Sequence, residues 1–79
     1  MITFQQVARL YHRDTLALAA KAVAKHGHHG KGDAFGARYL MACSAPYVRD
    51  CVARELDASR GYHNVAVQRL LCSLNSALS

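Results

Sequence analysis

The chain has 79 residues, of which 52% are apolar and 19% are charged, so it suits one folded domain with a modest core rather than a disordered segment. Ten lysine and arginine residues against five acidic residues give a formal net charge of +5, which favours an anionic partner. The most apolar run, residues 16–24, is short and contains Lys21, which argues against a membrane span. Three cysteines without a short paired spacing, and no basic-then-apolar leader, predict a cytoplasmic protein.

The first expected element is a long helix over residues 3–26. Thr3 and Gln6 have the spacing of a capping box, which satisfies backbone N–H groups at a helix start. Gly27 is a natural residue to follow the helix end, and Asp14 marks an irregularity where a second segment could be capped. Apolar and small residues then share one helical arc: Phe4, Val7, Tyr11, Leu18 and Ala22.

Two shorter helices are expected in the middle of the chain. Residues 27–33 contain three glycines and no apolar side chain, which predicts a loop. Asp33 is placed to cap a helix over residues 34–43. A third helix is expected over residues 46–58, with Ser44 as its cap, because a proline is tolerated in a first helical turn.

The last helix, over residues 64–78, has the cleanest periodicity. Asn64 can cap it, and apolar residues recur at i, i+3, i+4, i+7 and i+11: Val67, Leu70, Leu71, Leu74 and Leu78. With no alternating strand pattern and no repeat, the sequence predicts an all-α single domain over residues 1–79. Its architecture is expected to be a small irregular bundle of three to four amphipathic helices.

A histidine-rich stretch is the strongest candidate for a metal site. His26, His28 and His29 lie within four residues, and imidazoles suit zinc, nickel or copper. However, no histidine pair has helical i,i+4 spacing, and the surrounding glycines leave the loop unorganised. We therefore expect a solvated loop, with no metal and no cofactor.

Catalysis finds little support in the sequence. The acidic residues are few and form no pair suited to acid–base chemistry, and no phosphate-binding glycine motif follows a strand. Glu55 falls on the inner face of its helix, and we expect it to lie at the helix end in water. Pairing with an arginine and contact with a partner chain are the alternatives. The chain is therefore not expected to be an enzyme.

Two sets of residues are candidates for partner contacts. Basic side chains on the polar half of the first helix form a drifting stripe, and tyrosines and leucines are typical interface residues. The basic set is Arg9, Arg13, Lys21 and Lys25. The second set is Tyr39, Tyr47, Tyr62, Leu74 and Leu78.

Together these patterns predict a non-enzymatic protein-binding module. We expect a small regulator or inhibitor that occupies a partner protein's surface, by analogy in size with phage-type (viral) inhibitors of host systems such as CRISPR–Cas or transcription. Because the apolar faces are narrow and rich in alanine, we also expect a homodimer. The alternative is a small basic nucleic-acid-binding regulator that uses the stripe of Arg9, Arg13, Lys21 and Lys25.

Overall fold

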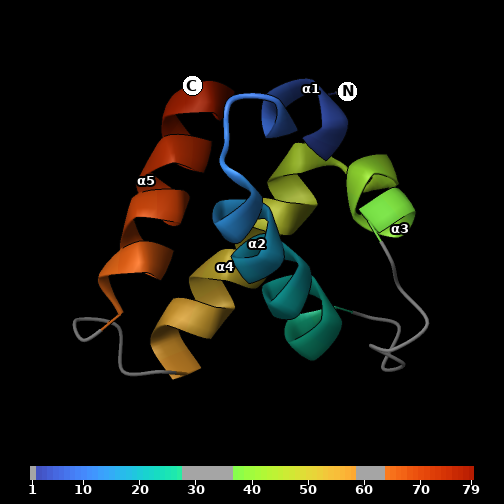
Figure 1. Cartoon of the computed structure of the whole chain (residues 1–79). Helices are drawn as coiled ribbons and strands as arrows, with labels where there is room; N and C mark the ends of the chain where they lie inside the picture. Colours follow the sequence, from blue (N-terminus) through green and yellow to red (C-terminus); the bar gives the residue numbers. More distant parts are fainter. Residues whose placement is uncertain (1, 28–36, 59–63) are drawn as a thin grey trace.

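A computed structural model describes residues 2–27, 37–58 and 64–79, and within these ranges the chain is helical, with no β-strand (Figure 1). The predicted all-α bundle is confirmed. The five helices are α1 (Phe4–Ala8), α2 (Arg13–His26), α3 (Ala37–Ala42), α4 (Ala45–Ala58) and α5 (Val65–Leu78).

Capping residues predicted from the sequence fix three helix starts. The Gln6 Oε1 accepts a hydrogen bond from the Thr3 backbone N–H at 2.8 Å. The Tyr47 N–H donates to the Ser44 Oγ at 3.2 Å, and the Val67 N–H donates to the Asn64 Oδ1 at 3.2 Å. Each bond satisfies a backbone group that has no partner within its helix, so local sequence determines where α1, α4 and α5 begin.

The prediction of one helix over residues 3–26 is wrong. The chain leaves helical geometry after Ala8, and the Leu10 N–H bonds back to the Val7 carbonyl at 3.0 Å in a tight turn. The second segment starts behind His12, whose Nδ1 accepts from the Asp14 N–H at 3.3 Å. The break therefore precedes Asp14, and a histidine, an uncommon N-cap residue, begins α2.

Helix α2 ends at His26, as predicted, but Gly27 follows it for a different reason than the one expected. Gly27 has φ −74° and ψ 168°, which is extended backbone and not the left-handed conformation that favours glycine. A side chain there would instead collide with the Tyr47 hydroxyl and come within 2.5 Å of the Val23 carbonyl oxygen. The predicted loop beyond Gly27 and the cap at Asp33 lie outside the described residues.

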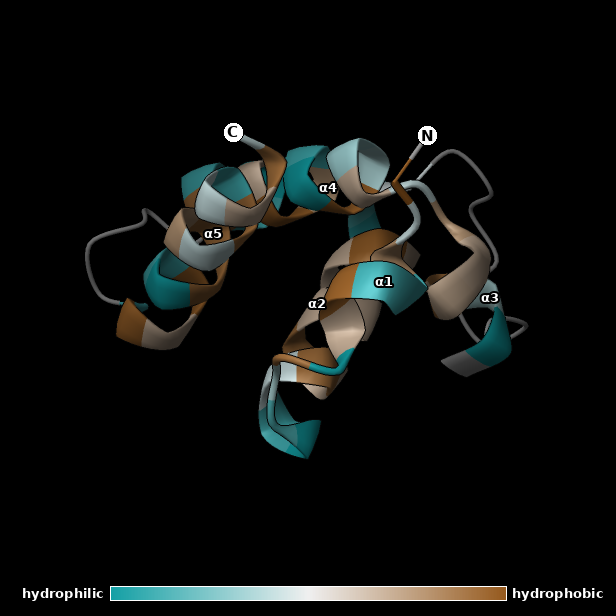
Figure 2. Cartoon of the chain, turned by 90° about the horizontal axis from the view of Figure 1, so that it is seen from above, coloured by the Kyte–Doolittle hydropathy of each residue, from teal (hydrophilic) through white to brown (hydrophobic). Residues whose placement is uncertain are grey.

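The core is built around α4, which packs against α1, α2 and α5. The largest fully buried side chains of the core are Phe4, Val48, Val52 and Leu74. Small residues such as Ala19 and Ala45, both 0% exposed, let neighbouring helices approach closely. Figure 2 shows polar and apolar residues alternating along α2, α4 and α5. None of the described helices is long and apolar enough to cross a membrane.

A short antiparallel bridge fastens the start of the chain to the junction between α3 and α4. The Phe4 N–H donates to the Cys43 carbonyl at 2.8 Å, and the Ala45 N–H donates to the Ile2 carbonyl at 2.8 Å. Phe4 is thereby held in the core, where its ring stacks on Tyr11 with ring centroids 6.3 Å apart. The bridge explains how a five-residue helix is positioned firmly against the rest of the bundle.

Candidate functional site

A half-open groove lies between the start of α2 and α5. Its volume is about 330 Å³, at the lower end of the range typical of ligand-binding clefts. The lining residues come from the start of α2, the turn before it and residues 66–73 of α5. They are Tyr11, Thr15, Leu18, Ala66, Arg69, Leu70 and Ser73.

Two contacts fix one end of the groove. The Tyr11 ring is stacked on the buried Phe4 at an interplanar angle of 18°. The Ser73 hydroxyl, on α5, donates a 3.0 Å hydrogen bond to the Tyr11 hydroxyl. Tyr11 therefore joins the turn between α1 and α2 to α5. Contacts within the chain thus fix this end of the groove.

The groove combines an apolar floor with hydrogen-bond donors. Leu18, Ala66 and Leu70 supply the apolar contacts. In the Tyr11–Ser73 pair one hydroxyl hydrogen is used between the two oxygens, so the other remains available to a ligand. Arg69 adds a guanidinium, and none of the described acidic residues forms an ion pair with it. The lining thus carries one positive charge and no negative charge.

Two exposed apolar side chains are neighbours in sequence of groove-lining residues. Among the described residues, Leu10 is 72% exposed and Val65 is 51% exposed. Leu10 directly precedes Tyr11, at the end where α5 contributes Ser73, and Val65 directly precedes Ala66 at the opposite end. Each exposed side chain is thus one position away in the chain from a residue that lines the groove.

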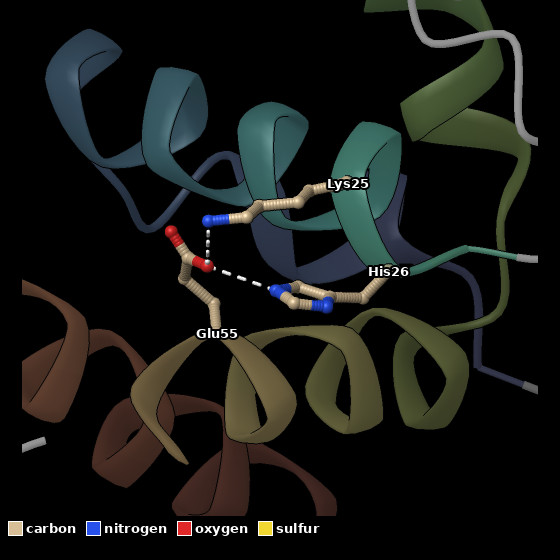
Figure 3. Close-up of polar contacts among 3 residues, drawn as sticks. All are labelled: Lys25, His26 and Glu55. Atoms are coloured by element: carbon tan, nitrogen blue, oxygen red, sulfur yellow. Dashed lines mark hydrogen bonds and ion pairs between the residues drawn. The ribbon is translucent and has the colours of Figure 1, made fainter. Parts of the chain in front are cut away.

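A second polar cluster ties α2 to α4 (Figure 3). The Oε1 of Glu55 lies 2.8 Å from the Nε2 of His26 and 3.3 Å from the Nζ of Lys25. Because a carboxylate only accepts, the Nε2 of His26 carries the hydrogen in this bond. The hydrogen bond from His26, opposed by partial burial and aided by Lys25, lowers the pKa of Glu55.

This cluster corrects the expectation for Glu55. The side chain does not end in water at the end of its helix, since it is 21% exposed and bonded to a residue 29 positions earlier in the chain. Its partners are a histidine and a lysine, where the sequence suggested an arginine. The cluster is a structural link, because its groups bond to one another and none of them lines the groove.

The predicted basic stripe is exposed but partly neutralised. All four of its residues, Arg9, Arg13, Lys21 and Lys25, have exposed side chains. Lys25 is paired with Glu55, and Asp14, 93% exposed, lies on the same side of α2 as Lys21 at 100° per residue. Arg13 points away from the face that carries Thr15 and Leu18. Two acidic side chains therefore accompany the cations along α2.

The predicted apolar contact residues have different positions. Tyr39 and Tyr47 are half-buried and pack against the core, and burial, with Cys43 and Tyr47 as neighbours, raises the pKa of Tyr39 to about 12. Leu74 is 0% exposed, so it belongs to the core of this chain and does not reach a partner. Leu78 is half-buried, and Tyr62 lies outside the described residues.

The sequence reasoning missed the groove. Of its lining, only Tyr11, Leu18 and Leu70 were predicted, as core-facing positions, and Arg69 was not among the candidate contact residues. The exposed Leu10 gave the best available signal, since it falls off the apolar arc of the first helix. The placement of α2 near α5, which creates the groove, depends on tertiary packing.

The three cysteines are free thiols that differ in exposure. Cys43 is half-buried and donates to the Tyr39 carbonyl at 3.3 Å, Cys51 is buried and Cys72 is exposed. Burial raises the pKa of the Cys43 and Cys51 thiols, which keeps them protonated. No group of three or more potential ligands gathers among residues 2–27, 37–58 and 64–79, and His28 and His29 lie outside these ranges.

No family model matches this chain, and no curated protein or solved structure matches it either. The fold places it in the class of small all-α domains. Its function is therefore argued from the groove.

Proposed function

We propose that this chain is a non-enzymatic protein-binding module whose binding surface is the groove between α2 and α5. One observation carries the proposal: the chain has a groove with an apolar floor, and the exposed side chains of Leu10 and Val65 directly precede two of its lining residues. Contiguous exposed apolar surface on a small domain is typical of an interaction site. The module acts as a small regulator or inhibitor by occupying a surface of its partner.

The shape of the groove favours a protein segment over a small molecule. The α5 wall runs from Ala66 to Ser73, which is two helical turns or about 10 Å at 1.5 Å per residue. A small ligand filling the cavity would leave Leu10 and Val65 exposed. A helix or extended segment of a partner covers the cavity and both ends together, as in other helix-in-groove interfaces.

A different protein is a better partner than a second copy. Two copies joined groove to groove by a two-fold axis would bring two Arg69 side chains to one interface, between chains that each carry +5. Like charges at close range disfavour that arrangement. The homodimer expected from the sequence is thus our second candidate, and light scattering at two salt concentrations measures it directly.

Nucleic-acid binding is the alternative from another class. The exposed basic residues supply phosphate contacts, but Asp14 and Glu55 reduce the positive charge along α2. A titration with duplex DNA at two salt concentrations separates the two functions. Sequence-independent phosphate binding falls steeply as salt rises, whereas an apolar groove is much less sensitive to salt.

The cellular setting belongs to the same proposal. A small, cationic helical module suits a cytoplasmic inhibitor, of the kind that phages direct against host systems such as CRISPR–Cas or transcription. This step rests on the size and character of the chain, and the identity of the captured partner decides it.

Affinity capture from a lysate of the source organism tests the proposal when three baits are compared. The baits are the wild type, Ala66→Arg, which fills the groove, and Asn75→Arg, which adds the same charge to the opposite face of α5. We expect one stoichiometric protein with the wild type and with Asn75→Arg, and its loss with Ala66→Arg. Recovery of nucleic acid alone, or equal capture by all three baits, would overturn the proposal.

A further inference from the structure

The wall of the groove carries one positive charge, on Arg69. Resting on the proposed protein-binding function, we propose that the groove takes one face of an amphipathic helix that carries a carboxylate opposite Arg69. The recognised motif is two helical turns with apolar anchors and an aspartate or glutamate beside them.

Arg69 is the charged member of the lining and has an exposed side chain. The four ion pairs within the described residues use Asp14, Asp50 and Glu55, and none of them involves Arg69. A guanidinium offers five N–H donors in a planar fork that matches a carboxylate. The groove therefore presents a donor set that a carboxylate satisfies.

Neighbouring hydroxyls strengthen the same preference. Thr15 lines the opposite wall, and the Tyr11–Ser73 pair keeps one hydroxyl hydrogen free for an acceptor. Asp14, next to Thr15 in the chain, is the acidic side chain closest in sequence to the lining, and it lies on the flank of α2 with its side chain 93% exposed. Hydrogen-bond acceptors on the partner thus meet hydrogen-bond donors along the groove. Asp14 repels a partner carboxylate only at the flank of α2.

The apolar part sets the spacing of the partner's anchors. Leu18 faces Ala66 and Leu70 across the groove, and small Ala66 leaves room for a larger incoming side chain. Leu10 and Val65, both exposed, directly precede the lining residues Tyr11 and Ala66. A helix with apolar residues at i, i+3 or i+4, and i+7 matches two turns of α5, so it contacts the floor and both ends.

Two synthetic peptides test this inference. Both are 14-residue amphipathic helices with leucines at i, i+3, i+4 and i+7, and they differ only in carrying glutamates or lysines beside the leucines. Each is titrated into the ¹⁵N-labelled chain while amide shifts are followed by NMR. We expect the glutamate peptide to shift amides of residues 11–18 and 66–73, with an affinity about tenfold higher than the lysine peptide at low salt.

Charge reversal supplies the matched variants. Arg69→Glu should weaken the glutamate peptide about tenfold and improve binding of the lysine peptide, since the attraction becomes repulsion. Arg13→Glu changes the net charge equally on the face of α2 that points away from the groove, and should leave the difference between the peptides largely intact. Both residues are exposed, so both variants should fold.

The outcomes separate this inference from the proposed function. Equal groove binding by both peptides, or equal effects of Arg69→Glu and Arg13→Glu, would overturn the acidic-helix inference and leave protein binding in the groove standing. Shifts from neither peptide would also overturn the inference, while the comparison of Ala66→Arg with Asn75→Arg in lysate capture still decides the proposed function.

Discussion

The hydroxyl of Ser73 donates a 3.0 Å hydrogen bond to the hydroxyl of Tyr11, 62 residues earlier in the chain. This contact joins the turn between α1 and α2 to the second half of α5. Because Tyr11 is also stacked on the buried Phe4, the end of the groove is connected directly to the core. Stability and groove geometry are therefore linked through Tyr11.

Removing this hydrogen bond should lower stability measurably. We expect Ser73→Ala to reduce the free energy of unfolding by about 1 kcal/mol relative to Ser76→Ala. Both substitutions replace serine by alanine within α5, so their effects on helix propensity cancel, and Ser76 is exposed. Chemical denaturation followed by circular dichroism measures the difference. Equal stabilities of the two variants would show that the contact with Tyr11 contributes nothing.

The bond between His26 and Glu55 should make stability depend on pH in a defined direction. The pKa of Glu55 is lowered in the folded chain from the ordinary carboxyl value of 4.5, chiefly by the hydrogen bond from His26. A carboxyl group with a lowered pKa stabilises the fold above its ordinary pKa, and this contribution disappears as the pH falls through the folded-state value.

We therefore expect Glu55→Gln to cost about 1 kcal/mol at neutral pH and progressively less as the pH is lowered from about 6 to about 3. Urea denaturation of both proteins across this range measures the change. Asp57→Asn, at an exposed position on the same helix, serves as the control. A cost of Glu55→Gln that stays constant with pH would contradict the assigned ionic contact.

The close approach of Tyr47 to Gly27 predicts that alanine is not tolerated there. A methyl group would meet the Tyr47 hydroxyl and the Val23 carbonyl oxygen, so we expect Gly27→Ala to destabilise the fold by about 1–3 kcal/mol. At φ −74° alanine has no backbone penalty, and without the collision it would stabilise the chain by about 0.4–1 kcal/mol. The sign of the change in thermal or chemical denaturation thus decides the point. The cost should fall in a Tyr47→Phe background.

Alanine substitutions of two leucines should distinguish a core residue from a surface residue. Leu74 is 0% exposed, so Leu74→Ala should cost about 2–5 kcal/mol by leaving a cavity. Leu10 is 72% exposed, so Leu10→Ala should change stability by less than about 0.5 kcal/mol while weakening capture of the partner. Denaturation and affinity capture on the same two variants provide the measurements. A large loss of stability with Leu10→Ala would mean that this side chain is part of the core.

Local sequence accounts for most of the helices. Gln6, Ser44 and Asn64 form the cap contacts that their spacing predicts, and the leucine periodicity of α5 places Leu70 and Leu74 in the core. The break before α2 was missed because the apolar arc from Phe4 to Ala22 continues through it. Neither glycine nor proline marks the turn, and its N-cap is His12.

The site depends on contacts that no local pattern encodes. Glu55 meets His26 across 29 residues, and Tyr11 meets Ser73 across 62. A helical arc identifies which side chains face inward, but it does not say which helix each one meets. Leu18 and Ala66 line a groove because α2 and α5 pack near each other while leaving a cavity between them. That arrangement is a property of the assembled bundle.

Site-specific photo-crosslinking tests the central claim most directly. The photoreactive residue p-benzoyl-phenylalanine is placed at Ala66, in the groove, or at Asn75, on the opposite face of α5, and each protein is irradiated in a lysate of the source organism. Binding through the groove predicts a single crosslinked protein partner from position 66 and little or none from position 75. Crosslinks of equal yield from both positions, or a partner captured only from position 75, would contradict it.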